Sequence, residues 1–431
     1  MRELIGRARP FFARFGIPRG LVSEPPALRA THSYGGNLWR LFAVQALLMF
    51  ILWVPIWVVF LQRKGLSLTQ VGLLEGVAWT ITAFLEVPTG AIADRWGRKA
   101  SIAAGALLYG LAMFLILAEA LSPAFLLGYA LWNSSTAFVS GADSALLYDS
   151  LKADGRATEA AKQSGRYAAI QQGSQGIASL VGAALATIDI NLCFAICGFL
   201  GLAAALLVLT IHEPPRTNED GDEYQSYWKN LKTAVRIAAR RPAVRALVLL
   251  NATILTVPLV VYYVLLQPYS VGVGLPLAAL GVIVIAVQLS TVLASWLAYR
   301  AAGRFELASV VAVALAVLIA ATVILAAVPS IPSLALMLAV AIVPALLTPL
   351  LSARLNDLIP SGQRATILSL GALLFELGLA VAMPLLLAFA DRFGAAAAIG
   401  LSGAVFALTA IPLLFVWRVA DRGPVPARAP G

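Results

Sequence analysis

Four acidic residues lie inside long apolar stretches of the sequence: Glu75, which falls nearer the outer surface, and Glu86, Asp143 and Glu376. A carboxyl group held away from water can take up and release a proton, and it can also bind a cation. Because polar side chains in hydrocarbon normally face a cavity or a neighbouring helix, these acids are candidates for proton coupling or for binding a substrate. Hydrogen bonds that join helices are the alternative role.

Amide and aromatic side chains recur at helical spacing in the same stretches. Gln172 and Gln175 fall on one face of their segment, and Asn133 falls on the same face as Asp143. Amides can hydrogen-bond a neutral solute, and tryptophan rings can contact an apolar or cationic one. Packing and interfacial anchoring are the alternatives. We expect a substrate cavity lined by Trp53, Trp132, Asn133, Gln172, Gln175 and Asn251.

The elements that hold these residues are predicted to be transmembrane helices. The chain has 431 residues, of which 60% are hydrophobic and 12% are charged, a composition typical of an integral membrane protein. Twelve stretches reach the roughly 20 residues that a helix needs to cross a bilayer. They are 38–61, 69–93, 100–118, 123–148, 164–188, 190–211, 243–267, 274–298, 306–328, 331–353, 364–390 and 394–417.

The stretches fall into two sets of six, 38–211 and 243–417, which are nearly equal in length and are separated by a polar segment. This spacing predicts an all-α membrane protein with 12 transmembrane helices in two six-helix halves, which we expect to be a monomer. The predicted parts are a basic N-terminal tail (1–37), an N-terminal bundle (38–212), a linker (213–242), a C-terminal bundle (243–418) and a C-terminal tail (419–431).

Positive charge gathers on one side of this topology. Of the 31 Lys and Arg residues, 28 lie on the side of the N-terminus, and only Arg63, Lys64 and Arg392 lie on the other. The positive-inside rule therefore places both termini and the linker in the cytoplasm of a multi-pass protein of the cell (plasma or inner) membrane. The net charge of +10 then reflects topology, and we expect no nucleic-acid partner. Both histidines lie outside the apolar stretches, so we expect no metal or cofactor.

A short charged segment, Gly90–Lys99, separates the second and third stretches and reads G-x-x-x-D-R-x-G-R-K. Its glycines permit close approach of two helices, although a hairpin that only sets topology is the plain alternative. The pattern resembles the signature loop of the major facilitator superfamily. That resemblance implies the fold of this family and alternating access. It also implies a cytoplasmic latch between the halves, with Asp94 near the start of the eleventh helix. The latch residues would be Gly90, Asp94, Arg95, Gly97, Arg98, Lys99 and the neighbouring Asp149.

The embedded acids, without embedded Lys or Arg, favour a secondary transporter that exports an apolar or cationic compound in exchange for protons. Uptake of a neutral nutrient such as a sugar is the alternative, with the amides as ligands. A remote alternative is an intramembrane aspartyl protease built on Asp143 and Asp149, but one helix would carry both acids. We therefore expect that the protein is not an enzyme. We expect its partners to be a small-molecule substrate, protons and the lipid bilayer.

Overall fold

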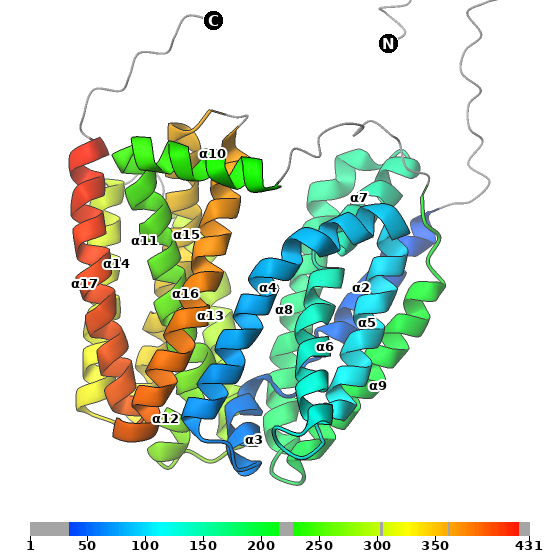
Figure 1. Cartoon of the computed structure of the whole chain (residues 1–431), viewed down its shortest axis with the longest axis horizontal. Coiled ribbons are helices and arrows are strands. Elements are labelled where there is room, and N and C mark those ends of the chain that lie inside the picture. Colours follow the sequence, from blue (N-terminus) through cyan, green and yellow to red (C-terminus); the bar gives the residue numbers. More distant parts are fainter. Residues whose placement is uncertain (1–33, 215–226, 302–304, 361–362, 422–431) are drawn as a thin grey trace, which may run out of the picture.

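The computed structural model describes residues 34–214, 227–301, 305–360 and 363–421, and for 85–96, 227–230, 299, 301 and 365 it describes the backbone alone. These residues form helices and no strand. Two helical bundles stand side by side, and helix α10 (Tyr227–Arg240) lies across one end of the second bundle (Figure 1). We call the end of the molecule that carries α10 the linker side and the other end the far side.

The N-terminal bundle contains eight α-helices and two short 3-10 turns within the described residues. In chain order the elements are α2 (Gly35–Leu48), η1 (Val54–Ile56), α3 (Trp57–Arg63), α4 (Leu68–Trp96), α5 (Arg98–Leu115), α6 (Pro123–Val139), α7 (Ala142–Ala153), η2 (Ala157–Glu159), α8 (Ala160–Leu185) and α9 (Ile190–Leu209). Local sequence explains two of the far-side helix starts. Ser122 accepts a hydrogen bond from the N–H of Phe125 at the start of α6, and Asp189 accepts one from the N–H of Asn191 at the start of α9.

The C-terminal bundle follows α10 and repeats the up-and-down order. Its described elements are α11 (Pro242–Leu259), the π-helical segment η4 (Val260–Leu265), α12 (Leu266–Gly272), α13 (Ala279–Ala301), α14 (Leu307–Ala327), η5 (Pro332–Ala335), α15 (Leu336–Leu358), α16 (Arg364–Phe393) and α17 (Ala395–Asp421). Helices α5 and α9 lie at one edge of the molecule, and α14 and α17 lie at the other (Figure 1).

Eight segments of the described chain are long and apolar enough to cross a membrane. They include α5 and α9 of the N-terminal bundle and every predicted span of the C-terminal bundle. The other four predicted spans are also helical: the first and fourth are broken, the fifth is more polar, and the second includes side chains that lie outside the described residues. The first is α2 with η1 and α3, the second is α4, the fourth is α6 with α7, and the fifth is α8, which is rich in glutamine, serine and glycine. As membrane crossings these four stay predictions.

Three of the predicted spans are interrupted, whereas the sequence suggested continuous helices. The first breaks between α2 and η1, just before Pro55. The fourth breaks between α6 and α7, where Gly141 adopts a φ of 79°, a left-handed conformation that suits a residue without a Cβ. The seventh contains the π-helical segment, which follows Pro258. Irregular backbone at membrane depth is tolerated where it is buried in protein or lines a cavity, so these breaks point to the functional region.

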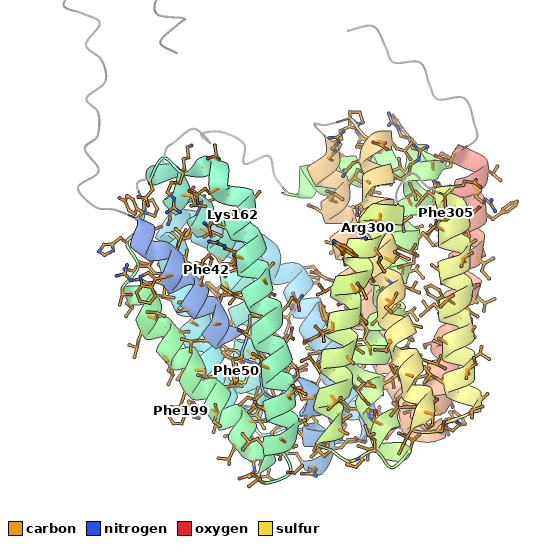
Figure 2. All side chains as sticks on the ribbon, turned by 180° about the vertical axis from the view of Figure 1, so that it is seen from behind. Phe42, Phe50, Lys162, Phe199, Arg300 and Phe305 are labelled. Atoms are coloured by element: carbon orange, nitrogen blue, oxygen red, sulfur yellow. The ribbon has the colours of Figure 1, made fainter. Side chains whose placement is uncertain are left out.

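The two bundles touch mainly through two helix pairs, α4 with α16 and α8 with α13, and to a smaller extent where α3 meets α12 and η1 meets α13. Glycines make the two main contacts close. A Cβ on Gly72 would stand 2.9 Å from the Cβ of Leu387, and one on Gly281 would stand 2.9 Å from the Cβ of Ala183. Both glycines lie in the far-side part of their helices. Toward the linker side the bundles diverge, so that Lys162 at the end of α8 and Arg300 at the end of α13 stand apart (Figures 1 and 2).

Candidate functional site

Gln267 of α12 fastens the broken first span to the opposite bundle. Its Oε1 atom accepts hydrogen bonds from the backbone N–H groups of Val58 (2.7 Å) and Val59 (3.4 Å), and its Nε2 atom donates to the carbonyl of Val54 (3.1 Å). The first N–H groups of a helix have no partner within that helix. The side chain is 2% exposed, so the amide satisfies groups of η1 and α3 that no water reaches.

A cavity of about 260 Å³ lies beside this contact, between the two bundles. Glutamine amides, tyrosine rings and aliphatic side chains line it, and no acid, lysine or arginine belongs to the lining among the side chains that the structure describes. Such a volume is slightly below the ~300 Å³ at which pockets for drug-sized ligands begin, and it suits a small solute. The lining residues are Val54, Gln172, Gln175, Leu259, Tyr262, Tyr263, Leu266, Gln267, Val284, Val287, Gln288 and Thr291.

One polar atom in the lining lacks a partner. The Oε1 atom of Gln288 is buried and accepts no hydrogen bond. A buried acceptor left unpaired costs about 1–3 kcal/mol, so a ligand that donates a hydrogen bond there would gain affinity. The structure thus brings Gln172 and Gln175, two of the expected cavity residues, together with Gln288 and Thr291. The spacing of Gln288 and Thr291 on one helical face was the signal for the second pair, whereas Gln267 gave no pattern in the sequence.

Trp53 and Trp132, which we expected in the cavity, lie inside the N-terminal bundle. Their rings meet edge to face with centroids 4.7 Å apart, and Trp53 donates a hydrogen bond to the hydroxyl of Tyr109 (3.2 Å). Both side chains are buried or nearly so, and neither lines the cavity described above. Aromatic side chains with this burial serve mainly to pack, because they carry a large apolar area and one polar atom that needs a partner.

Glu75 lies against this aromatic cluster. Its Oε1 atom accepts hydrogen bonds from the indole of Trp57 (2.7 Å) and from the hydroxyl of Tyr129 (3.0 Å). The residue is 3% exposed, and no described ion pair involves it. The position of Glu75 in the sequence predicts a site near the membrane surface, whereas the structure buries it beside the aromatic cluster. Its i, i+4 relation to Trp79 was the available signal.

Asp143 stands in the first turn of α7, just after the break in the fourth span. The hydroxyl of Tyr167 lies 2.8 Å from Oδ2 of Asp143 and 2.7 Å from Oε1 of Gln45. One hydroxyl has one proton to donate, so both oxygens are satisfied at once only when Asp143 carries a proton or the Gln45 amide turns. The hydroxyl of Tyr167 therefore joins α2, α7 and α8 at one point.

The remaining predicted residues are spread over several helices. Glu376 on α16 is 7% exposed and has an interaction partner. Asn133 donates to the carbonyl of Tyr129 within its own helix (2.8 Å), and it lies on α6, whereas Asp143 lies on α7. The helical face that these two residues were expected to share is therefore broken. The Oδ1 atom of Asn251 on α11 is buried without a hydrogen-bond partner.

The charged segment Gly90–Lys99 begins inside α4 and ends in the first turn of α5, and its described side chains contact their own bundle. Arg98 forms an ion pair with Asp149 and donates to the carbonyl of Ala145 (2.9 Å), and Lys99 donates to the carbonyl of Leu209 at the end of α9 (2.7 Å). All three contacts stay within one bundle, because the bundles diverge on this side. In this conformation Arg98, Lys99 and Asp149 therefore do not join the two halves, and their role as a latch between the halves stays a prediction.

Gly97 sits between α4 and α5 with a φ of 106°, and the N–H of Arg98 donates to the carboxylate of Glu213 (2.8 Å). The other candidates, Glu86, Gly90, Asp94 and Arg95, belong to the last part of α4, where the structure describes the backbone alone.

The sequence profile of the Major Facilitator Superfamily matches residues 38–343. No curated protein matches the sequence. Among solved structures, a bacterial homologue of the human lysosomal transporter Spinster, inward-facing and unoccupied, has 18% sequence identity and a TM-score of 0.69, covering 91% of this chain and 98% of that one.

The nucleoside transporter NupG has 14% identity and a TM-score of 0.71, covering 90% of this chain and 100% of that one. A D-xylose-proton symporter has 16% identity and a TM-score of 0.63, covering 89% of this chain and 97% of that one. At these identities the structural likeness shows the fold, and the profile match covers most of the chain. The chain therefore belongs to the Major Facilitator Superfamily.

Proposed function

We propose that this chain, which has the fold of a family of transporters and is not an enzyme, carries a small neutral solute with several hydrogen-bonding groups across the membrane. The observation that carries this proposal is the lining of the cavity between the bundles. Gln172, Gln175 and Gln288 offer amide donors and acceptors, while Tyr262 and Tyr263 add aromatic surface. Because no acid or base belongs to the described part of the lining, the cavity favours a neutral solute over the cationic compound that the embedded acids suggested.

Alternating access is the mechanism we infer. The bundles meet closely on the far side and diverge on the linker side, and the cavity lies between them. By the positive-inside rule the linker side is cytoplasmic, so this conformation would be open toward the cytoplasm. Rocking of one bundle against the other would expose the same cavity to the far side.

Proton coupling is the second part of the proposal. The shared hydroxyl of Tyr167 supports Asp143 as a proton-carrying group, because loss of its proton leaves two oxygens competing for one donor. Glu376 stays a candidate through its burial in α16. Replacing Asp143 with Asn should abolish the response of transport to a pH gradient while keeping exchange of solute between the two sides. A variant that still responds to the gradient would remove Asp143 from the coupling step.

The substrate class can be tested by thermal stabilisation of the purified protein, since a ligand that binds the native state raises its melting temperature. Neutral sugars, polyols and nucleosides should include stabilising compounds, and quaternary ammonium compounds should not. Gln175→Ala should weaken that stabilisation. The control is Gln171→Ala, which removes another glutamine of the same helix that lies outside the lining, and it should preserve the stabilisation. Stabilisation by the cationic set alone would contradict the proposal.

The direction of transport, efflux or uptake, follows from the same solutes in inverted and right-side-out vesicles. Accumulation in inverted vesicles driven by an outward-directed proton gradient would favour efflux by exchange. Accumulation only in right-side-out vesicles would favour uptake.

A further inference from the structure

Asp391, near the far-side end of α16, contacts the first turn of α4 in the other bundle. Its Oδ2 atom accepts a hydrogen bond from the hydroxyl of Thr69 (2.8 Å), and its Oδ1 atom accepts one from the backbone N–H of Leu68 (3.2 Å). The partners lie far apart in the sequence, one near the beginning of the first half and the other near the end of the second. The contact therefore joins the two halves of the protein at the end opposite the linker.

The start of α4 is built so that this carboxylate completes it. Ser67 and Gln70 form a reciprocal pair, in which the Ser67 hydroxyl accepts from the N–H of Gln70 (3.2 Å) and the Gln70 amide oxygen accepts from the N–H of Ser67 (2.9 Å). Beside this capping box, the N–H of Leu68 has no partner among the described residues of its own bundle. Asp391 supplies that partner from the other bundle.

The contact is electrostatically favourable as well. A carboxylate near a helix N-terminus is attracted by the partial positive charge of the unpaired N–H groups. Hydrogen bonds to an ionised group are also stronger than those between neutral groups. The two donors on α4 therefore hold the Asp391 carboxylate more firmly than a neutral side chain at this position could be held.

The helices α4 and α16 run in opposite directions and pack against each other. Gly72 and Gly76 bring them together just inside the contact of Asp391, where a Cβ on Gly76 would stand 2.8 Å from the carbonyl oxygen of Ala380. Opening the far side requires these helices to separate. Because Asp391 belongs to one helix and its two donors to the other, the same movement breaks both hydrogen bonds.

We propose that Asp391, Leu68 and Thr69 form a far-side clasp, which holds the far side closed and must break once in each transport cycle. The clasp would complement the linker-side latch expected for Asp94. In this scheme Asp391, near the C-terminal end of α16, binds the N-terminus of α4. Asp94, near the C-terminal end of α4, would bind the N-terminus of α16. The proposal rests on alternating access as proposed above and deepens it by assigning the residues that hold one of its two conformations.

The test measures the far-side distance between the bundles with spin labels on Ile188→Cys and Val328→Cys. Both positions are exposed on the far side, one in each bundle, and the native Cys193 and Cys197 are buried. In lipid nanodiscs, Asp391→Ala should raise the ratio of far-side-open to far-side-closed molecules roughly tenfold, the effect of losing charge-assisted hydrogen bonds. Thr69→Val, which keeps the shape of the side chain, should shift the ratio in the same direction by a smaller factor.

Asp189→Ala is the matched control. Asp189 is also a far-side carboxylate at a helix N-terminus, but its partner, the N–H of Asn191, belongs to the same bundle. This variant should lower the melting temperature and leave the ratio unchanged. Suppose that the unmodified chain populates both conformations. The clasp alone would then be overturned if Asp391→Ala left the ratio of far-side-open to far-side-closed molecules unchanged, or if Asp189→Ala changed that ratio equally. If the unmodified chain never opens on the far side with any solute, alternating access itself is wrong.

Discussion

Gly281 offers a direct way to push the two bundles apart. It lies in the first turn of α13 and faces α8 across the second contact between the bundles. A Cβ at this position would stand 2.9 Å from the Cα of Leu180 and from the Cβ of Ala183, and closer still to the carbonyl oxygen of Ser179. The Cα and the carbonyl oxygen are backbone atoms, which cannot turn aside as a side chain can.

The size of the effect of Gly281→Ala follows from this geometry. Carbon atoms pack at about 3.5–4.0 Å, so α8 and α13 must separate by roughly 1 Å to admit the methyl group. Overpacking of this kind typically costs about 1–3 kcal/mol. The cost falls on the conformation in which the helices touch, so the equilibrium should move toward far-side opening by a factor of about 5–150.

Fluorescent labels at Lys162→Cys and Arg300→Cys would report this shift, because the two positions stand apart here (Figure 2) and closure of the linker side should bring them together. Gly110→Ala is the control. Its Cβ would stand 2.9 Å from the N atom of Leu202 and 3.0 Å from the carbonyl oxygen of Gly198, both on α9 of the same bundle. That variant should lower stability in both conformations. Equal label distributions for Gly281→Ala and the unmodified chain would refute the reasoning.

Three further changes test contacts described above. Gln267→Leu should lower the melting temperature by several degrees, because it orphans buried backbone groups of α3 at about 1–3 kcal/mol each. Glu75→Gln keeps an acceptor oxygen and should melt close to the unmodified protein, whereas Glu75→Leu should melt lower; the reverse order would contradict the assigned hydrogen bonds. Arg156→Ala should raise the pKa of Glu159 from about 2, since the Arg156 guanidinium is its main hydrogen-bond partner. A depressed pKa means that the stabilising contact is fully present above the ordinary pKa of glutamate and is lost as the pH falls through about 2. An NMR titration should therefore find Glu159 fully ionised at pH 4 only while Arg156 is present.

The sequence was sufficient for the fold because long apolar runs and their spacing are strong signals. It also predicted the common helical face of Gln172 and Gln175, which survives in an unbroken helix, while their role in binding a solute stays a prediction. It failed for Asn133 and Asp143, because helical spacing assumes continuity and a left-handed Gly141 separates α6 from α7 between them. No local pattern identifies a break of this kind when neighbouring helices satisfy the freed backbone groups.

Gln267 and the tryptophans illustrate a different limit. The role of Gln267 depends on a helix in the other half of the chain, and one glutamine in an apolar run has no period to detect. For Trp53 and Trp132 the residue type suggested a ligand surface, but their burial depends on packing between helices that the sequence does not order. Residue type and period therefore located the polar helices, while the orientation of each side chain came only from the tertiary contacts.

The dependence of α3 and α4 on Gln267 and Asp391 has a consequence for biosynthesis. Ribosomes release the N-terminal bundle first, at a time when the amide and the carboxylate that complete these two helices have not been made. Until then the N–H groups of Val58, Val59 and Leu68 must find substitutes in water, lipid headgroups or an insertion chaperone. The first bundle produced alone should thus be short-lived in the cell, and supplying the second bundle as a separate polypeptide should extend its lifetime.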